Sequence, residues 1–391
     1  MQSEEPSTAG EDSGLDGLGF AAEATRPLAA VAGAAPAADG SLASASGGRT
    51  GGGTSGTGGG TGGGRPEPRR RSLRSRLGLS DIAFRSALRG FGMMVLLLEL
   101  MLGSFLAYRA SQALRKAGWS FLTTQAWNPD GGGFGIAAVI TGTCLIALTA
   151  VVVGVPLALG TALFIAEYAP PRYRRVLTSV IDLMAAVPSV VFGMWGAYLL
   201  QYKVIALSKW LSTWFCWIPF LRVPGVQRGD PLASQTAYTS STFIAGIVVG
   251  LMIMPIACSI MREAFSQAPI GEREGAYALG ATRWGMIRAV VLPFGRGAMI
   301  GGTMLGLGRA LGETIAVALI ISPVYAIQPH ILAKGSSSVS SMIALLYSES
   351  TPFGVSALMA AGLALFALTL IVNFIAARVV ARSRSGAVSD A

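Results

Sequence analysis

The sequence predicts an all-α polytopic membrane protein with about six transmembrane helices, and three observations support this fold class. Of the 391 residues, 52% are hydrophobic and only 13% are charged, whereas soluble domains carry about 25% charged residues. The apolar residues gather in long runs, and a helix needs about 20 of them to cross a bilayer. Arginines flank these runs, as they do at the cytoplasmic ends of membrane spans. We therefore expect a multi-pass protein of the cytoplasmic (inner) membrane.

Six stretches have the length and hydropathy of a membrane-spanning helix. The second has about 33 residues and would measure about 50 Å as a straight helix. We expect one tilted crossing, kinked at Pro156, because two crossings would place the arginines at 172–175 on the outer side. The predicted spans are 88–109, 135–168, 177–201, 241–262, 295–322 and 354–379.

The composition divides the chain into four parts. Residues 1–64 are mostly Gly, Ala, Ser and Thr, too poor in apolar surface to fold, so we expect a disordered cytoplasmic tail. This tail does not resemble a signal peptide, because acidic residues replace the basic start and no apolar core follows. Residues 65–87 form a basic juxtamembrane segment, 88–382 the transmembrane domain and 383–391 a short cytoplasmic tail.

The distribution of Lys and Arg predicts that both termini are cytoplasmic. Four arginine-rich segments then lie inside, and the three segments predicted outside hold five tryptophans, which favour the membrane interface. The inner segments are 65–76, 170–175, 262–296 and 378–384; the outer ones are 113–134, 201–240 and 322–352, with Trp119, Trp127, Trp210, Trp214 and Trp217.

Several function classes find no support. Cys144, Cys216 and Cys258 lack the spacing of a zinc site or a disulfide framework, and His330 lies in a polar stretch typical of a solvated loop. The net charge of +10 has no aromatic-interleaved platform for nucleic acid. We therefore expect no metal, cofactor or nucleic-acid partner. The chain also lacks the Gly-x-x-x-x-Gly-Lys-Ser/Thr loop that binds ATP phosphates.

The longest inner loop, residues 263–293, has the pattern of two short helices separated by Gly280. Trp284, Ile287 and Val291 recur at helical spacing and predict one apolar face on the second helix. We expect Pro293 to end this helix and begin the next span. Such a loop suits a groove on a partner protein, and it equally suits the lipid headgroups.

The spacing within this loop resembles the EAA loop of ABC-importer permeases, which reads EAA, three residues, G, nine residues, I-x-L-P. Gly275 replaces the first Ala of that pattern and Val290 replaces the Ile. The resemblance implies the fold of type I importer permeases (MetI-like) and a loop that docks onto a nucleotide-binding subunit. The residues that it assigns to this coupling are Glu274, Gly275, Ala276, Gly280, Leu292 and Pro293.

Charged residues inside the spans need an explanation, because Arg at the centre of a membrane helix costs about 2.5–3.5 kcal/mol on insertion scales. Arg309 lies near the middle of the predicted fifth span, and Glu313 follows at i+4 on the same face. The two could pair, or Arg309 could face a water-filled path, where its guanidinium suits an oxyanion. Glycines at 302, 306, 308 and 312 would let a helix or a substrate approach the backbone.

Two further acids are candidates to pair with Arg309. Glu99 lies within the first span and Asp182 near the inner part of the third. For Glu99, the alternatives are a protonated carboxyl or a hydrogen bond to a partner subunit. Asp182 could instead lie in the headgroup region near Arg175.

The segment 308–314 closely resembles the Gly-Arg-Ala-x-Gly-Glu-Thr signature of phosphate-importer permeases. Similar matches extend over about residues 80–382, and the Trp127 segment and Trp195 favour the PstC type over the PstA type. The resemblance implies a permease subunit for inorganic phosphate, with Arg309, Glu313 and Thr314 in the substrate pathway.

The same resemblance implies the rest of the machine. The partners would be a homologous second permease (PstA type), an ABC ATPase dimer (PstB type) and an extracytoplasmic phosphate-binding protein (PstS type), all serving transport across the lipid bilayer. Three alternatives stay open. They are a similar importer for another oxyanion such as molybdate or sulfate, a secondary transporter with an inverted repeat, and a membrane receptor or regulatory subunit.

Overall fold

The computed structural model describes residues 78–226 and 234–384. Within them, six helical stretches are long and apolar enough to cross a membrane, so the predicted number of spans is confirmed. The predicted tail at 1–64 and most of the segments 65–87 and 383–391 lie outside the described residues. The six stretches are Ser80–Ala117, Ala137–Tyr168, Ser189–Trp214, Thr242–Ser266, Arg283–Gly312 and Pro352–Ala381.

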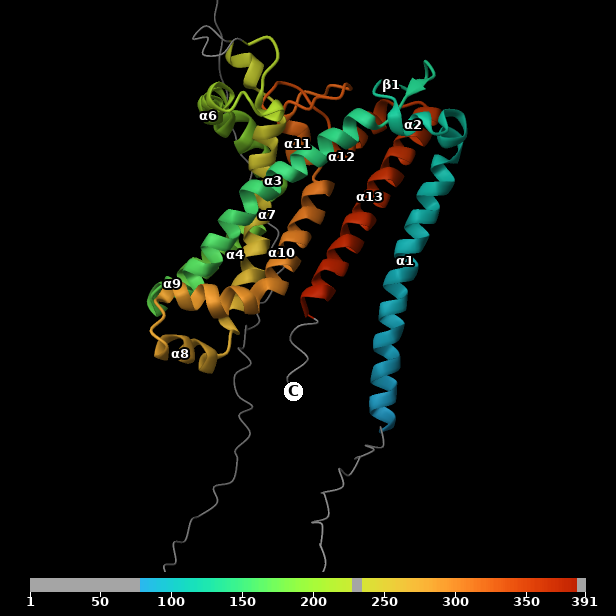
Figure 1. Cartoon of the computed structure of the whole chain (residues 1–391). Coiled ribbons are helices and arrows are strands. Elements are labelled where there is room, and N and C mark those ends of the chain that lie inside the picture. Colours follow the sequence, from blue (N-terminus) through green and yellow to red (C-terminus); the bar gives the residue numbers. More distant parts are fainter. Residues whose placement is uncertain (1–77, 227–233, 385–391) are drawn as a thin grey trace, which may run out of the picture. The chain divides into compact units, whose positions relative to one another are not determined.

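Helices make up most of the described structure, and the short segments η1, η2 and η5 have π-helical hydrogen bonding (Figure 1). The first half of the chain holds α1 (Leu79–Ala117), α2 (Ser120–Thr123), β1 (Trp127–Asn128), β2 (Gly133–Phe134), α3 (Ala137–Leu163), η1 (Phe164–Tyr168), α4 (Pro171–Ala186), α5 (Ser189–Trp195), η2 (Gly196–Leu200), α6 (Gln201–Trp214) and η3 (Pro219–Leu221). The second half holds η4 (Gln235–Tyr238), α7 (Thr242–Ser266), α8 (Ile270–Ala278), α9 (Arg283–Met286), η5 (Ile287–Val291), α10 (Leu292–Gly312), α11 (Ile315–Ile320), α12 (Val339–Leu346), η6 (Tyr347–Glu349) and α13 (Pro352–Arg384).

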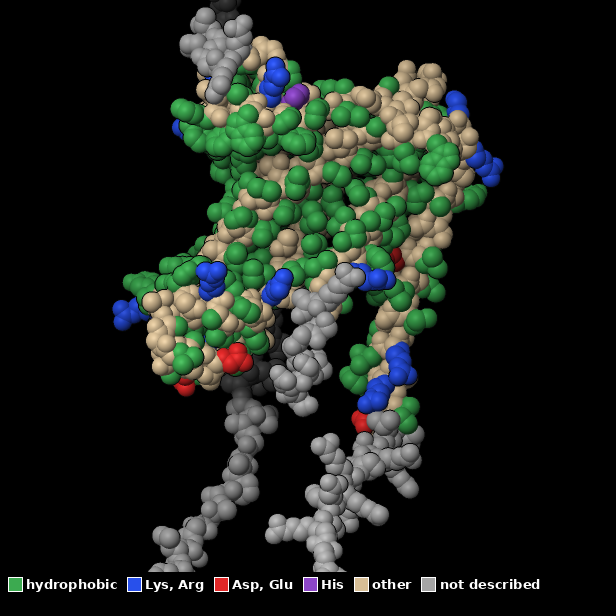
Figure 2. All heavy atoms as spheres, in the orientation of Figure 1, with side chains coloured by type: hydrophobic (Ala, Val, Ile, Leu, Met, Phe, Trp, Pro, Cys, Tyr) green, Lys and Arg blue, Asp and Glu red, His purple; other side chains and the backbone are tan. Residues whose placement is uncertain are grey.

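The bundle has two distinct ends (Figure 1). One carries the antiparallel hairpin β1–β2, in which Trp127 pairs with Phe134, and we call it the hairpin end. The other carries α8 and α9, and we call it the elbow end. The start of α1 and the end of α13 lie on the elbow side, as the predicted topology requires of two termini on one side of the membrane. Hydrophobic side chains cover the visible surface between the two ends (Figure 2).

The second span crosses once, as predicted: α3 runs into η1 without interruption and holds Pro156 within it. Its main packing partner is α7, which holds Pro255. The two helices approach so closely because small residues face each other. A Cβ on Gly154 would lie 2.6 Å from the Gly250 carbonyl oxygen, and one on Gly250 would lie 2.9 Å from that of Ala150. Such contacts replace the hydrophobic driving force that helices in lipid lack.

The predicted third span at 177–201 is wrong in both of its bounds. Helix α4 ends at Ala186, and the backbone is extended at Val187 and Pro188. A residue that precedes proline is disfavoured in the α conformation, so the helix stops there rather than kinking. The spanning helix begins at Ser189 and continues through η2 and α6 to Trp214.

The predicted fifth span at 295–322 is also wrong in both bounds. The spanning helix starts at Arg283, within the predicted loop, and ends at Gly312. Glu313 has an extended ψ of 126°, and a separate short helix, α11, begins at Ile315. Glycine is a poor helix residue, and the seven glycines of α10 weaken its continuation. The break lies in the apolar run that suggested one span.

We expect the α3–α7 approach to tolerate no added methyl group. Gly154→Ala should lower the thermal unfolding temperature in detergent, because overpacking costs about 1–3 kcal/mol. Gly160→Ala is the matched control: a Cβ there meets nothing within 4 Å, and alanine favours the helix by about 1 kcal/mol. Equal melting temperatures for the two variants would refute this account of the packing.

Candidate functional site

The elbow, residues 270–293, consists of α8, α9, η5 and the first two residues of α10, with a tight turn at Gly280 between α8 and α9. The amide of Ala281 donates to the carbonyl of Ala276 at 3.0 Å, and that of Gly280 donates to Tyr277 at 2.9 Å. This pattern is a Schellman motif, which places its glycine in the left-handed region, and Gly280 has φ +81°. The side chain of Thr282 then caps α9 by accepting from the amide of Gly285 at 3.1 Å. The predicted two-helix loop is therefore confirmed.

The elbow rests on the ends of α3 and α7. Its buried side chains join a cluster with residues of those two helices and of α4, and Ala276 and Leu292 pack against the cluster while half-buried. The elbow contributes Met286, Ile287 and Val291 to the cluster. The other residues assigned to coupling, Glu274, Gly275, Gly280 and Pro293, are exposed. The elbow thus has an inner side fixed to the bundle and an outer side left open.

Two expectations for the second helix of the elbow were wrong. Trp284 does not share the buried face of Ile287 and Val291, because its side chain is 56% exposed whereas theirs are fully buried. Pro293 does not end the helix, because α9, η5 and α10 form one continuous stretch from Arg283 to Gly312. Proline is tolerated near the start of a hydrogen-bonded segment, and the π-helical η5 precedes it here.

The outer side of the elbow is apolar at several points. Leu279 beside the turn is 91% exposed, and Ile270, Tyr277 and Trp284 are exposed as well. Acidic and basic residues, Glu272, Glu274 and Arg283 among them, surround these apolar side chains. An apolar centre with a charged rim is the composition of a protein-binding surface.

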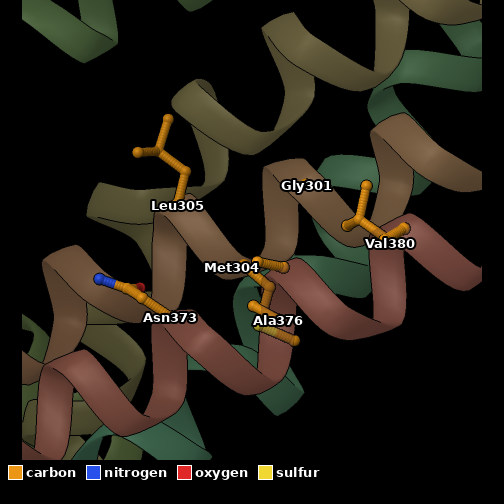
Figure 3. A pocket seen from close by; sticks show the side chains of 8 residues that line it. Gly301, Met304, Leu305, Asn373, Ala376 and Val380 are labelled. Carbon is orange, nitrogen blue, oxygen red and sulfur yellow. The ribbon is translucent and has the colours of Figure 1, made fainter. Parts of the chain in front are cut away.

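Arg309 lies in the last turn of α10, exposed, rather than near the middle of a longer helix. It lines a pocket of about 290 Å³ together with residues of α7, α10 and α13, among them Ile256 and Asn373. A second pocket, of about 470 Å³, shares Met304, Leu305 and Asn373 with the first and continues along α10 and α13 (Figure 3). Arg309 therefore stands at one end of a groove between two spans.

Glu313 and Thr314 form the break between α10 and α11. The Glu313 carboxylate accepts a hydrogen bond from the amide of Ala316 at 3.4 Å, and its own carbonyl accepts one from the hydroxyl of Ser340 at 2.7 Å. The Thr314 hydroxyl donates to the carbonyl of Gly312 at 3.1 Å. The buried Glu313 is thereby held at the start of α11, where a carboxylate is favoured by the helix dipole.

Within residues 78–226 and 234–384, the proposed pairs of Arg309 with Glu313, Glu99 or Asp182 do not form. Glu313 is not on the same helical face, since α10 ends one residue before it. Asp182 accepts a hydrogen bond from Ser259 at 3.5 Å. Glu99 lines a groove of about 580 Å³ between α1 and α13.

The sequence reasoning missed three residues. Asn373 contributes the amide that faces the groove beside Arg309. Glu167, in η1, and Arg273, in α8, form an ion pair with 2.9 Å between Nη1 and Oε1. The sequence contained a signal for this pair, because a carboxylate at the end of an apolar span needs a charged or hydrogen-bonding partner. The identity of the partner could not be read from it, because the two residues lie 106 positions apart.

Residues 154–385 match the family described as binding-protein-dependent transport system inner membrane component. The phosphate transport system permease protein PstC 2 of Mycobacterium tuberculosis is 38% identical over 302 residues, which are 76% of this chain and 90% of the relative. PstC of Pasteurella multocida is 35% identical over 295 residues, 75% of this chain and 89% of the relative.

Among solved structures, a bacterial ABC transporter involved in the import of the acidic polysaccharide alginate is 18% identical, with a TM-score of 0.47 over 77% of this chain and 98% of that one. The family match covers more than half of the sequence, and the relatives in M. tuberculosis and P. multocida exceed 30% identity along most of their length. The chain therefore belongs to the family of binding-protein-dependent transport system inner membrane components, as a multi-pass membrane protein.

Proposed function

We propose that this chain is a permease subunit of an ATP-driven importer of inorganic phosphate. The supporting observation is identity of 35–38% to relatives named as phosphate transport permeases, over about nine-tenths of their length. Because the same fold can serve other substrates, the phosphate assignment depends on these relatives rather than on helix number. The chain would form half of the translocation pathway and hydrolyse nothing itself.

The elbow is the proposed contact with the ATPase (PstB type), through Glu274, Gly275 and Gly280 on its open side. An exposed leucine in water is unfavourable, and full burial of such a side chain is worth about 1.5–3 kcal/mol. Leu279 is 91% exposed, so a partner that covers this side chain would gain binding free energy. The lipid headgroups are the alternative occupant, and ATPase binding by the purified complex distinguishes the two. The inner side of the elbow, including Ala276 and Leu292, and the exposed Pro293 that follows it would carry the motion into α10.

Arg309 is the proposed anion contact in the pathway, at the end of the groove between α10 and α13. A guanidinium keeps its charge and can donate several hydrogen bonds to an oxyanion. Its position near the break brings it within a few residues of Glu313 and Thr314. We assign Glu313 and Thr314 to the pathway because they stabilise the non-helical backbone between α10 and α11. We assign Arg309 to it because of its charge.

The remaining partners follow from the proposed activity. A second permease (PstA type) would complete the pathway, and an extracytoplasmic phosphate-binding protein (PstS type) would deliver the anion. The elbow end and both termini would then face the cytoplasm, as the arginine distribution indicates.

Arg309→Gln should lower phosphate uptake by about 10- to 100-fold, because a hydrogen bond to a charged group is worth about 1.5–3 kcal/mol. Uptake of radiolabelled phosphate by proteoliposomes with the full transporter measures the effect. Arg296→Gln, at an exposed position of the same helix, should leave uptake within about twofold. Wild-type uptake by the Arg309 variant would remove its assigned role.

Gly280→Val should reduce phosphate-dependent ATP hydrolysis and transport together, because a branched side chain is strained at φ +81° by about 1–3 kcal/mol. The same substitution at Gly271, in the first turn of α8 with open space around it, is the control. ATPase activity of the purified complex is the measurement. Normal turnover in the Gly280 variant would exclude the elbow as the coupling site.

Two competing functions are distinguished by transport assays. We expect uptake to require ATP inside the proteoliposomes and to be competed by arsenate far more than by molybdate or sulfate, because arsenate shares the geometry and protonation of phosphate. Uptake without ATP would establish a secondary transporter. Stronger competition by molybdate or sulfate would reassign the substrate.

A further inference from the structure

Glu167 is a carboxylate at the end of the second span, and its side chain is only 5% exposed. It lies in η1, the last turn of that span. A buried carboxylate is costly unless it is paired and hydrogen-bonded. Arg273 of α8 supplies this partner: its Nη1 lies 2.9 Å from Oε1 and donates to Oε2 at 3.1 Å.

The same guanidinium also holds the end of the fourth span. Its Nε donates to the carbonyl of Ala268 at 3.2 Å, and its Nη2 donates to that of Phe265 at 2.5 Å. Phe265 belongs to the last turn of α7, where a positive charge is favoured by the helix dipole. Arg273 is therefore one side chain from the elbow that joins the ends of α3 and α7, the two helices that pack most closely.

The neighbours of Glu167 are held in a similar way. Arg174 of α4 donates to the carbonyl of Ala166 at 2.8 Å. Arg283 of α9 lies over the ring of Tyr168, 5.2 Å from its centre. Three consecutive residues of η1, at the end of the second span, thus each contact a different arginine, and two of the three arginines come from the elbow.

The elbow is connected to the bundle along the chain at both of its ends, to α7 and to α10, and by packing and polar contacts in between. Its second helix continues through η5 into α10, so movement passes to that span along the chain itself. Its first helix is separated from α3 by about a hundred residues, and the Glu167–Arg273 pair provides the polar connection between them. Without this pair, a displaced α8 could slide over the apolar end of α3.

We propose that the Glu167–Arg273 ion pair is a transmission link, which makes α3 follow the elbow when the ATPase displaces it. The two residues are positioning residues: they act through the helices that they join and do not contact the transported anion. The inference rests on the proposed contact between elbow and ATPase. It adds that the force reaches α3, which the chain does not connect to the elbow directly, through a polar contact that a single substitution removes.

The test is the amount of phosphate transported per ATP hydrolysed by the complete transporter in proteoliposomes. Glu167→Gln keeps the shape of the side chain and removes its charge. We expect the ATPase to remain bound and active while the transport-to-hydrolysis ratio falls by about 5- to 150-fold, the usual range of energetic coupling between two sites. Arg273→Gln should lower the ratio similarly. The double variant should have a ratio no lower than that of the more impaired single variant, because the two residues act as a unit.

Two variants serve as references. Glu263→Gln makes the same chemical change at an exposed position on the last turn of α7 and should leave the ratio unchanged. Glu167→Asp keeps the charge but shortens the side chain by one methylene, and it should give an intermediate ratio. If the complex with Glu167→Gln does not assemble, Glu167→Asp is the variant on which the ratio is measured.

The outcomes separate this inference from the function on which it rests. A wild-type ratio in Glu167→Gln overturns the transmission link, and so does a loss of assembled complex with a normal ratio in what remains, since that is the result of a purely structural pair. If the wild-type chain neither binds an ATPase nor transports phosphate, the proposed function itself fails.

Discussion

The close approach of α3 and α7 is the constraint on which the remaining arrangement depends. In lipid, two helices gain little from covering each other's apolar side chains, because the acyl chains cover them equally well. What remains is backbone proximity, and the chain achieves it with Gly154 and Gly250 at the crossing. The elbow, the break at Glu313 and the groove beside α13 are all positioned relative to this pair.

The number of spans and the two-helix elbow could be predicted, because both are written in local patterns. A run of apolar residues has to cross the membrane whatever its neighbours are, and a glycine at the required distance from two helical stretches marks a turn. The bounds of the third and fifth spans could not be predicted in the same way. Hydropathy does not distinguish an apolar helix from an apolar segment that is interrupted, as at Val187–Pro188 and Glu313–Thr314.

The candidate site shows the same division. The residues of the elbow were assigned through the resemblance to the EAA loop. Of the two alternatives for Arg309, the pair with Glu313 assumed a continuous helix, and it does not form because the helix ends before Glu313. The partner of Glu167 could not be inferred, because tertiary packing alone brings α8 to the end of α3. Buried charges of this kind carry little information about their partners in one sequence, although their presence says that a partner exists.

At the interruption, the carbonyl groups of Gly312 and Glu313 and the Glu313 carboxylate each accept a hydrogen bond from within the chain. The donors are the Thr314 hydroxyl, the Ser340 hydroxyl and the amide of Ala316. Non-helical backbone at membrane depth is otherwise tolerated only against protein or water. These three acceptors are therefore oriented by the chain itself, without solvent or cargo. In the proposed pathway, an ion that reaches this segment would meet dipoles already fixed in direction, so the reorganisation energy of binding would be small.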